Sequence, residues 1–211
     1  YGGTSVPFRV TNNTTIRTRV PAGATADAAF TVTNPVGSDT SPTVSLDADA
    51  PYGPERGLTL DGDGDYVATG ATGPDLGLVN ESFSIDLWFK VEATDGKEYA
   101  LVGLWDGGTT NHVLQIFVDG GDLRFTFFGN DMGTSGEPVT IGAWQHATFV
   151  YDAAKPGGDG DRFVYLNGEQ VAADESSGDF QGTTELLIGH VPERSRDFDG
   201  QMDQVRVWEG V

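Results

Sequence analysis

Short runs of alternating apolar and polar residues, separated by glycine-containing turns, constrain this chain more than any other feature. In one such run the apolar side chains share one face of a strand, because successive strand residues point to opposite sides: Phe83, Ile85, Leu87 and Phe89. Asp119-Gly120-Gly121 and Asn167-Gly168 are typical of hairpin turns, since glycine tolerates positive φ. No amphipathic helix of useful length is visible, so the pattern predicts an all-β antiparallel sandwich.

The predicted strands of the main domain follow one another at short intervals. They cover 65–69, 82–91, 99–105, 112–119, 123–128, 144–152, 162–166, 185–189 and 201–208. In the last of them Val205 and Val207 share a face, and we expect Trp88 and Trp208 to lie in the core because their strands are rich in apolar residues.

Residues 1–50 differ in composition from the rest of the chain. They are rich in Thr, Ala, Val and Pro, and they contain period-two runs but few large apolar side chains. Such a segment cannot build much of a core alone. We therefore predict three parts: a β-rich attachment or assembly segment at 1–50, a linker at 51–57 and a β-sandwich at 58–211. This first part would pack on the main domain, on a neighbouring copy of the chain or on another protein, because exposed edge strands are templates for such pairing.

The charge excludes two classes of partner. The chain has 32 Asp and Glu residues against 12 Lys and Arg, a net charge of −20. Such a surface repels nucleic acid and anionic membranes, and no stretch approaches the length of about 20 apolar residues that a membrane-spanning helix needs. Only three of the basic residues are Lys, which favours adaptation to molar salt, where charges are screened within about 3 Å. Without cysteine the chain forms no disulfide and no thiolate-bound metal site.

Four stretches, in order, resemble one superfamily: LDGDGDYV (60–67), ESFSIDLWFKV (81–91), FVYLNGEQVA (163–172) with LLIGH (186–190), and FDGQMDQVRVW (198–208). Together they resemble the laminin G-like, concanavalin A-like lectin/glucanase domains. The resemblance covers about residues 58–211 and implies a jelly-roll sandwich of two curved antiparallel sheets.

That superfamily includes laminarinase-like hydrolases, in which two Glu flank an Asp on one strand. Retaining chemistry needs two carboxyl groups about 5–5.5 Å apart. Here Asp86 is present, but Ser84 and Trp88 stand where the two Glu would be. We therefore predict that the domain is not an enzyme. His112 and His146 are scattered, without the spacing of metal ligands.

Calcium is the expected cofactor, either at a structural site or at the rim of the sandwich, where Asp106, Asn111 and Asp131 offer oxygen ligands. Asp61, Asp63 and Asp65 offer three carboxylates at alternate positions, although the same pattern is typical of a solvated turn. The resemblance implies that Asp203, which precedes a Val-Arg-Val strand, helps to hold a structural calcium with backbone carbonyls near the start of the domain. In molar salt, sodium or potassium is an alternative occupant.

The resemblance implies a non-catalytic binding or adhesion module that recognises a cell-surface glycan or protein through loops at the rim of the sandwich. The candidate rim residues are Trp105, Asp106, Asn111 and Asp131. We expect the domain to be displayed extracellularly, on a cell or virion surface, as part of a spike or tail fibre. The alternative is a purely structural subunit of a filament, capsid decoration or surface layer, which would assemble as a homo-oligomer through residues 1–50; a glycoside hydrolase is the remote alternative.

Overall fold

A computed structural model describes residues 57–93, 96–136, 138–153, 160–192 and 196–210, together with four short strands nearer the N-terminus. The chain divides into two units, Tyr1–Ala50 and Pro51–Val211. In the first unit, β1 (Phe8–Asn12) pairs with β2 (Thr15–Thr18), and β3 (Thr31–Asn34) pairs with β4 (Gly37–Thr40). Most of the predicted linker, 51–56, lies outside the described residues.

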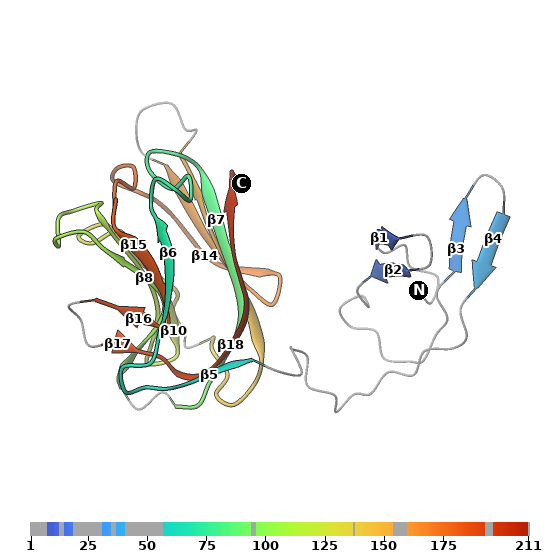
Figure 1. Ribbon diagram of the computed structural model, residues 1–211, viewed down its shortest axis with the longest axis horizontal. Coiled ribbons are helices and arrows are strands. Elements are labelled where there is room, and N and C mark those ends of the chain that lie inside the picture. Colours follow the sequence, from blue (N-terminus) through green and yellow to red (C-terminus); the bar gives the residue numbers. More distant parts are fainter. Residues whose placement is uncertain are drawn as a thin grey trace. The chain divides into compact units, whose positions relative to one another are not determined.

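The second unit is a sandwich of two six-stranded antiparallel sheets (Figure 1). The first sheet runs in the order β11 (Asp131–Gly133), β10 (Asp122–Thr126), β9 (Val113–Asp119), β8 (Glu98–Trp105), β15 (Glu185–Ile188) and β6 (Val67–Thr72). The second runs in the order β14 (Glu169–Glu175), β13 (Asp161–Leu166), β12 (Gln145–Asp152), β7 (Phe83–Val91), β18 (Asp199–Glu209) and β5 (Leu58–Asp61). The predicted antiparallel sandwich is therefore confirmed.

The core lies between the inner faces of the two sheets. On β7 the alternating residues expected to share a face are all fully buried, and on β9 the same is true of alternate residues such as Ile116. Aromatic rings join the layers, because Phe125 of the first sheet packs edge to face on Phe149 of the second at a centroid distance of 5.7 Å. Edge-to-face pairs of this kind add stabilisation beyond the area that they bury.

A two-stranded hairpin, β16 (His190–Val191) with β17 (Arg196–Asp197), packs against β8 of the first sheet. Gly103 of β8 makes this approach possible. A Cβ atom at that position would lie 2.3 Å from the carbonyl oxygen of His190, which no side chain tolerates. The outer face of the first sheet is thus partly covered by the chain itself.

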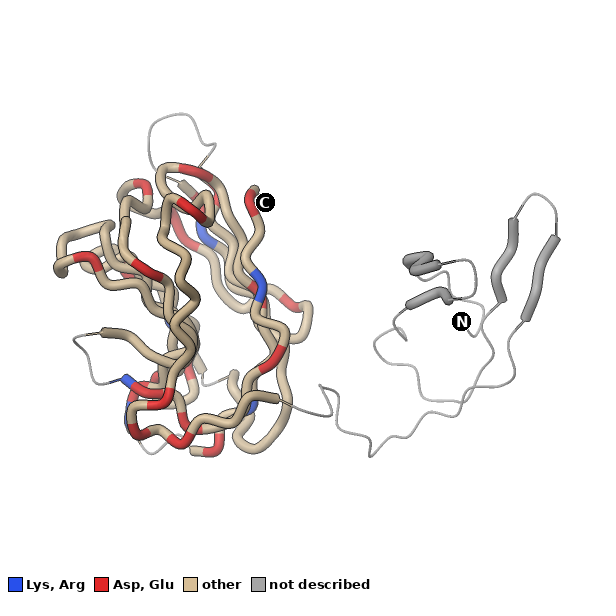
Figure 2. Tube along the Cα trace, in the orientation of Figure 1, with Lys and Arg blue, Asp and Glu red and all other residues tan. Residues whose placement is uncertain are grey.

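Acidic residues are spread along both sheets of the described domain, and basic residues are few (Figure 2). Among the described residues no helix is long and apolar enough to cross a membrane.

Candidate functional site

The outer face of the second sheet carries the strongest candidate for a binding surface. Because β7, β12 and β13 alternate inward and outward, every second residue points away from the core. We call this surface the open face. Its residues include Ser84, Asp86, Trp88 and Lys90 of β7, His146, Thr148 and Val150 of β12, Phe163 and Tyr165 of β13, and Asp203, Arg206 and Trp208 of β18.

The strand register aligns the open face in rows. One row reads Trp208, Ser84, Val150, Phe163 across four neighbouring strands, and the next reads Arg206, Asp86, Thr148, Tyr165. Adjacent strands lie about 4.8 Å apart, so the first row separates its two aromatic ends by about 14 Å.

A β-bulge sets the orientation of the last strand. Asp203 lies opposite Trp88 and Arg206 opposite Asp86, so β18 has one more residue than β7 between these pairs. Gln204 takes a positive φ of 50°, and its N–H donates to Asp203 Oδ1 at 2.7 Å. The extra residue shifts the alternation, and this places the Arg206 and Trp208 side chains on the open face.

Asp86 is the centre of a hydrogen-bond cluster on this face, although only 6% of it is exposed. Its Oδ1 accepts from Arg206 Nε at 3.0 Å and Nη2 at 2.5 Å, and it lies 3.0 Å from His146 Nε2. Its Oδ2 accepts from the indole Nε1 of Trp208 at 2.6 Å. Burial alone would raise the pKa of Asp86, but the donors of Trp208, Arg206 and His146 outweigh it and hold that pKa below its ordinary value.

Trp208 is anchored by its nitrogen and exposed at its ring. Its exposed fraction is 53%, so the expectation that it lies in the core is wrong. The core positions of this strand segment are taken by Val205 and Val207, which pack against the core from the opposite face. Trp88 is half-buried on the open face, and its ring lies tilted against that of His146 at a centroid distance of 5.2 Å, so it too is not a core residue.

The four predicted rim residues do not form a single cluster of contacts, and their surroundings differ. Asp106 Oδ2 accepts from both the N–H and the hydroxyl of Thr183 at 2.9 Å, and these bonds, set against a smaller effect of burial, keep the pKa of Asp106 low. The Trp105 ring packs edge to face on Phe128 at 5.6 Å. Asp131, at the start of β11, is exposed.

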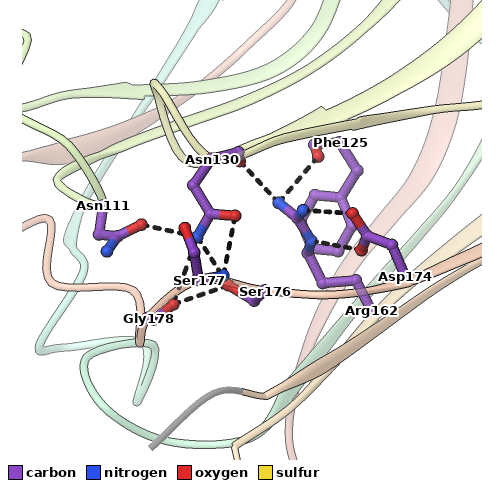
Figure 3. A network of polar contacts seen from close by, with 8 residues as sticks. All are labelled: Asn111, Phe125, Asn130, Arg162, Asp174, Ser176, Ser177 and Gly178. Atoms are coloured by element: carbon purple, nitrogen blue, oxygen red, sulfur yellow. Dashed lines mark hydrogen bonds and ion pairs between the residues drawn. The ribbon is translucent and has the colours of Figure 1, made fainter.

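Asn111, the remaining rim candidate, belongs to a network that joins three loops (Figure 3). Asn130 Nδ2 donates to Asn111 Oδ1 and to the Ser176 hydroxyl, each at 2.7 Å. The carbonyl of Asn130 in turn accepts from the buried guanidinium of Arg162, which also forms a double hydrogen bond with Asp174. The side-chain amide of Asn130 and the Oδ1 atom of Asn111 thus bond within the protein, which gives this end of the sandwich a structural role.

The predicted metal ligands lie in two places: Asp61, Asp63 and Asp65 at and just after the end of β5, and Asp203 on β18. Asp61 pairs with Asp199 across β5 and β18, and it accepts from the N–H of Asp63, while Asp203 lies at the bulge. Asp61 also borders a hollow of about 450 Å³. No group of three or more His, Asp or Glu suited to a metal occurs among the described residues. The carboxylates of these four residues therefore do not form one shared ligand set. A site at Asp203 built on carbonyls stays a prediction.

The three positions that correspond to the hydrolase carboxylates lie on β7. Ser84, Asp86 and Trp88 do share the open face. The central carboxylate is occupied by three donors of the protein, and its two neighbours supply a hydroxyl and an indole in place of carboxylates.

Residues 61–211 match the family model described as the concanavalin A-like lectin/glucanases superfamily, so the chain belongs to this family. A search of curated proteins found no match.

Solved structures with the same fold include several named for carbohydrate-active proteins. The CBM40 domain of Ruminococcus gnavus IT-sialidase, solved also with α2,3-sialyllactose, has a TM-score of 0.58 at 12% identity, covering 73% of this chain and 90% of that one. Domain 4 of the arabinanase AbnA from Geobacillus stearothermophilus, in complex with arabinotriose, has a TM-score of 0.53 at 18% identity, covering 87% and 76%. Mouse laminin α1 domains LG4-5 have a TM-score of 0.53 at 16% identity, covering 79% of this chain and 44% of that one. At these identities the likeness shows the fold.

Proposed function

We propose that the domain is a non-catalytic carbohydrate-binding module that holds a glycan chain on the open face. The observation that carries the proposal is Trp208, whose ring is 53% exposed while its nitrogen is fixed to a buried carboxylate. A rigid, exposed indole presents an apolar surface at little cost in conformational entropy, and the C–H faces of sugar rings stack on such surfaces.

The remainder of the open face suits an extended ligand. Phe163 and Tyr165 of β13 and Trp88 of β7 are half-buried, so part of each ring is accessible. Polar groups lie between the aromatic ones, including the Thr148 hydroxyl and the Arg206 guanidinium, whose side chain is 44% exposed. Apolar surfaces with a few placed polar groups are the usual composition of ligand sites.

The solved structures of the same fold support a glycan as the ligand class. Two of them, the CBM40 domain and the arabinanase domain, were solved with a bound sugar. The absence of a carboxylate pair at 84 and 88 supports a binding role over hydrolysis. Such a module would be displayed outside the cell in a high-salt environment. Residues 1–50 would attach it to a larger assembly.

A glycan microarray tests the proposal with the full chain and its Trp208→Ala variant. The wild type should bind a related group of oligosaccharides, and the variant should lose that binding while keeping its melting temperature within a few degrees. Thr183→Ala, which alters the Asp106 contact at the rim, is the matched control and should bind as the wild type does. Binding that survives Trp208→Ala but is lost in the control would overturn the open face as the site.

A further inference from the structure

The charges on the open face are compensated locally. Arg206 bonds to Asp86 through two of its nitrogens, and Lys90 lies 3.0 Å from the carboxylate of Glu92. Each Lys or Arg among the described residues of this face therefore has a carboxylate partner. A carboxylate on an incoming sugar would find no uncompensated cation there, and it would bring its own charge close to Asp86.

Asp86 compensates the charge of Arg206 at contact distance, and its carboxylate is held under its donors with only 6% of the residue exposed. A carboxylate on the protein surface would offset the charge of Arg206 much less. The net charge of −20 adds a longer-ranged repulsion of anions, which falls off beyond about 10 Å at moderate salt.

Asp86 leaves the Trp208 ring and several N–H donors of Arg206 accessible, and both suit neutral sugars. Its Oδ2 fixes the plane of the Trp208 indole, while the Trp208 ring stays exposed. The Arg206 guanidinium has five N–H donors in total, and it bonds to Asp86 through Nε and Nη2. The remaining donors suit sugar hydroxyls, which are neutral acceptors.

We infer that Asp86 is a positioning residue that makes the open face selective for neutral glycans over uronate or sialate glycans. This inference rests on the proposed function. It separates this chain from the CBM40 domain solved with sialyllactose, a sugar that carries a carboxylate, and aligns it with the domain solved with the neutral arabinotriose.

Matched oligosaccharides test the selectivity at low salt. The probes are β-1,4-linked hexamers of glucose and of glucuronate, and of mannose and of mannuronate, which differ within each pair only at C6. Calorimetry with the full chain should give at least tenfold tighter binding of the neutral member of a pair.

Two variants move the selectivity in opposite directions. Asp86→Asn keeps the shape but leaves Arg206 uncompensated, so the ratio of neutral to acidic affinity should fall about tenfold. Arg206→Gln leaves Asp86 uncompensated, so that ratio should rise. Glu169→Gln, on the exposed edge strand of the same sheet, removes one negative charge away from the cluster and should leave the ratio unchanged within about twofold.

The outcomes distinguish this inference from the function on which it rests. A wild type that binds the uronate hexamers as tightly as the neutral ones, or a ratio that neither variant changes, overturns the inference and leaves a glycan-binding module. A protein that binds no glycan on the array and none of these hexamers overturns both. If Asp86→Asn does not fold, Arg206→Gln alone still decides, because an unchanged ratio in that variant contradicts the role of the pair.

Discussion

The outer faces of the two sheets use the same three groups in opposite ways. On the first sheet, Arg196 of the β16–β17 hairpin lies over the ring of Phe117 at 4.0 Å and bonds to Glu98, and the Arg196 residue is 9% exposed. On the second sheet, Arg206 and Asp86 accompany Trp208, which stays 53% exposed. An arginine, an aromatic ring and a carboxylate occur in both places, but the chain covers only the first cluster.

The difference indicates what each face does. On the first sheet the cation, the ring and the carboxylate satisfy one another beneath a hairpin, so this cluster holds the fold together. On the second sheet the polar atoms are equally satisfied, yet the apolar ring is left in water. A fixed and exposed aromatic ring does little for folding, which is why we propose that it contacts a ligand.

The largest effect is expected on the covered face. Arg196→Ala leaves Glu98 without the guanidinium, removes one of the two donors to Gln115 Oε1 and uncovers Phe117, so the free energy of unfolding should fall by about 3 kcal/mol. Urea denaturation measures this loss. Arg206→Ala is the counterpart on the open face, and a loss as large in that variant would remove the distinction between the two clusters.

The hairpin itself can be displaced. Gly103→Ala places a Cβ atom 2.3 Å from the His190 carbonyl oxygen, so the hairpin must shift and stability should fall by about 2 kcal/mol. Thr148→Ala on the open face is the comparison and should change stability by about 0.5 kcal/mol or less. Thermal denaturation of both variants measures the difference, and equal melting temperatures would show that the hairpin is not tightly packed.

On the open face the large effect should appear in binding rather than in stability. Trp208→Ala should weaken glycan binding by about 2 kcal/mol, roughly thirtyfold, which is the scale of an aromatic hot spot. Its stability should fall by about 1 kcal/mol or less, because half of the ring is already in water. Calorimetry measures the loss of affinity, and denaturation of the same preparation measures the loss of stability. A large loss of stability with unchanged affinity would identify Trp208 as a structural residue.

The Asp86 cluster should depend on pH with a defined sign. Its folded-state pKa lies below the ordinary value, so its contribution is complete above the unfolded pKa of about 3.9 and is lost as pH falls through the folded pKa. Wild type and Asp86→Asn should therefore differ by about 1 kcal/mol at pH 6 and converge in acid. Denaturation at a series of pH values measures the difference, and a gap that widens in acid would contradict the assigned direction.

Calcium is expected to have the smallest effect. The described residues hold no cluster of three or more carboxylate or imidazole ligands, so a site at Asp203 would bind weakly. Millimolar calcium should raise the free energy of unfolding by about 1 kcal/mol or less, and Asp203→Asn should remove the increase. Thermal melts with calcium and then with chelator test this. A shift as large after Asp203→Asn would exclude Asp203 as the ligand.

The sequence predicts the sandwich because alternation is a local signal. The inward residues of β7 are evident from the run that starts at Phe83, and the hairpin between β13 and β14 from Asn167-Gly168, whose φ angles are positive as such turns require. Val205 and Val207 share one face of their strand, and Trp208 must then point to the opposite face. The sequence therefore already contradicts the expectation that Trp208 lies in the core.

The candidate site is much less evident from the sequence. The bulge at Gln204 depends on the register between β18 and β7, which no local pattern reveals. Arg206 and Trp208 lie about 120 residues from Asp86 in the chain, and they meet it only because the two strands pair. The rim residues were predicted from loop composition, and the contacts of Asn111 within the protein could not be read from that composition.

The claim that a glycan binds on the open face is tested most directly by locating the bound glycan with NMR. Titration of the labelled domain with a neutral hexamer that it binds should shift the indole N–H signal of Trp208 first, followed by backbone amides of β7, β12, β13 and β18. The signals that shift should outline the open face, and those of the loop from Trp105 to Asn111 should not move. Shifts confined to that loop and to Asn130, with the Trp208 signal unmoved, would contradict it.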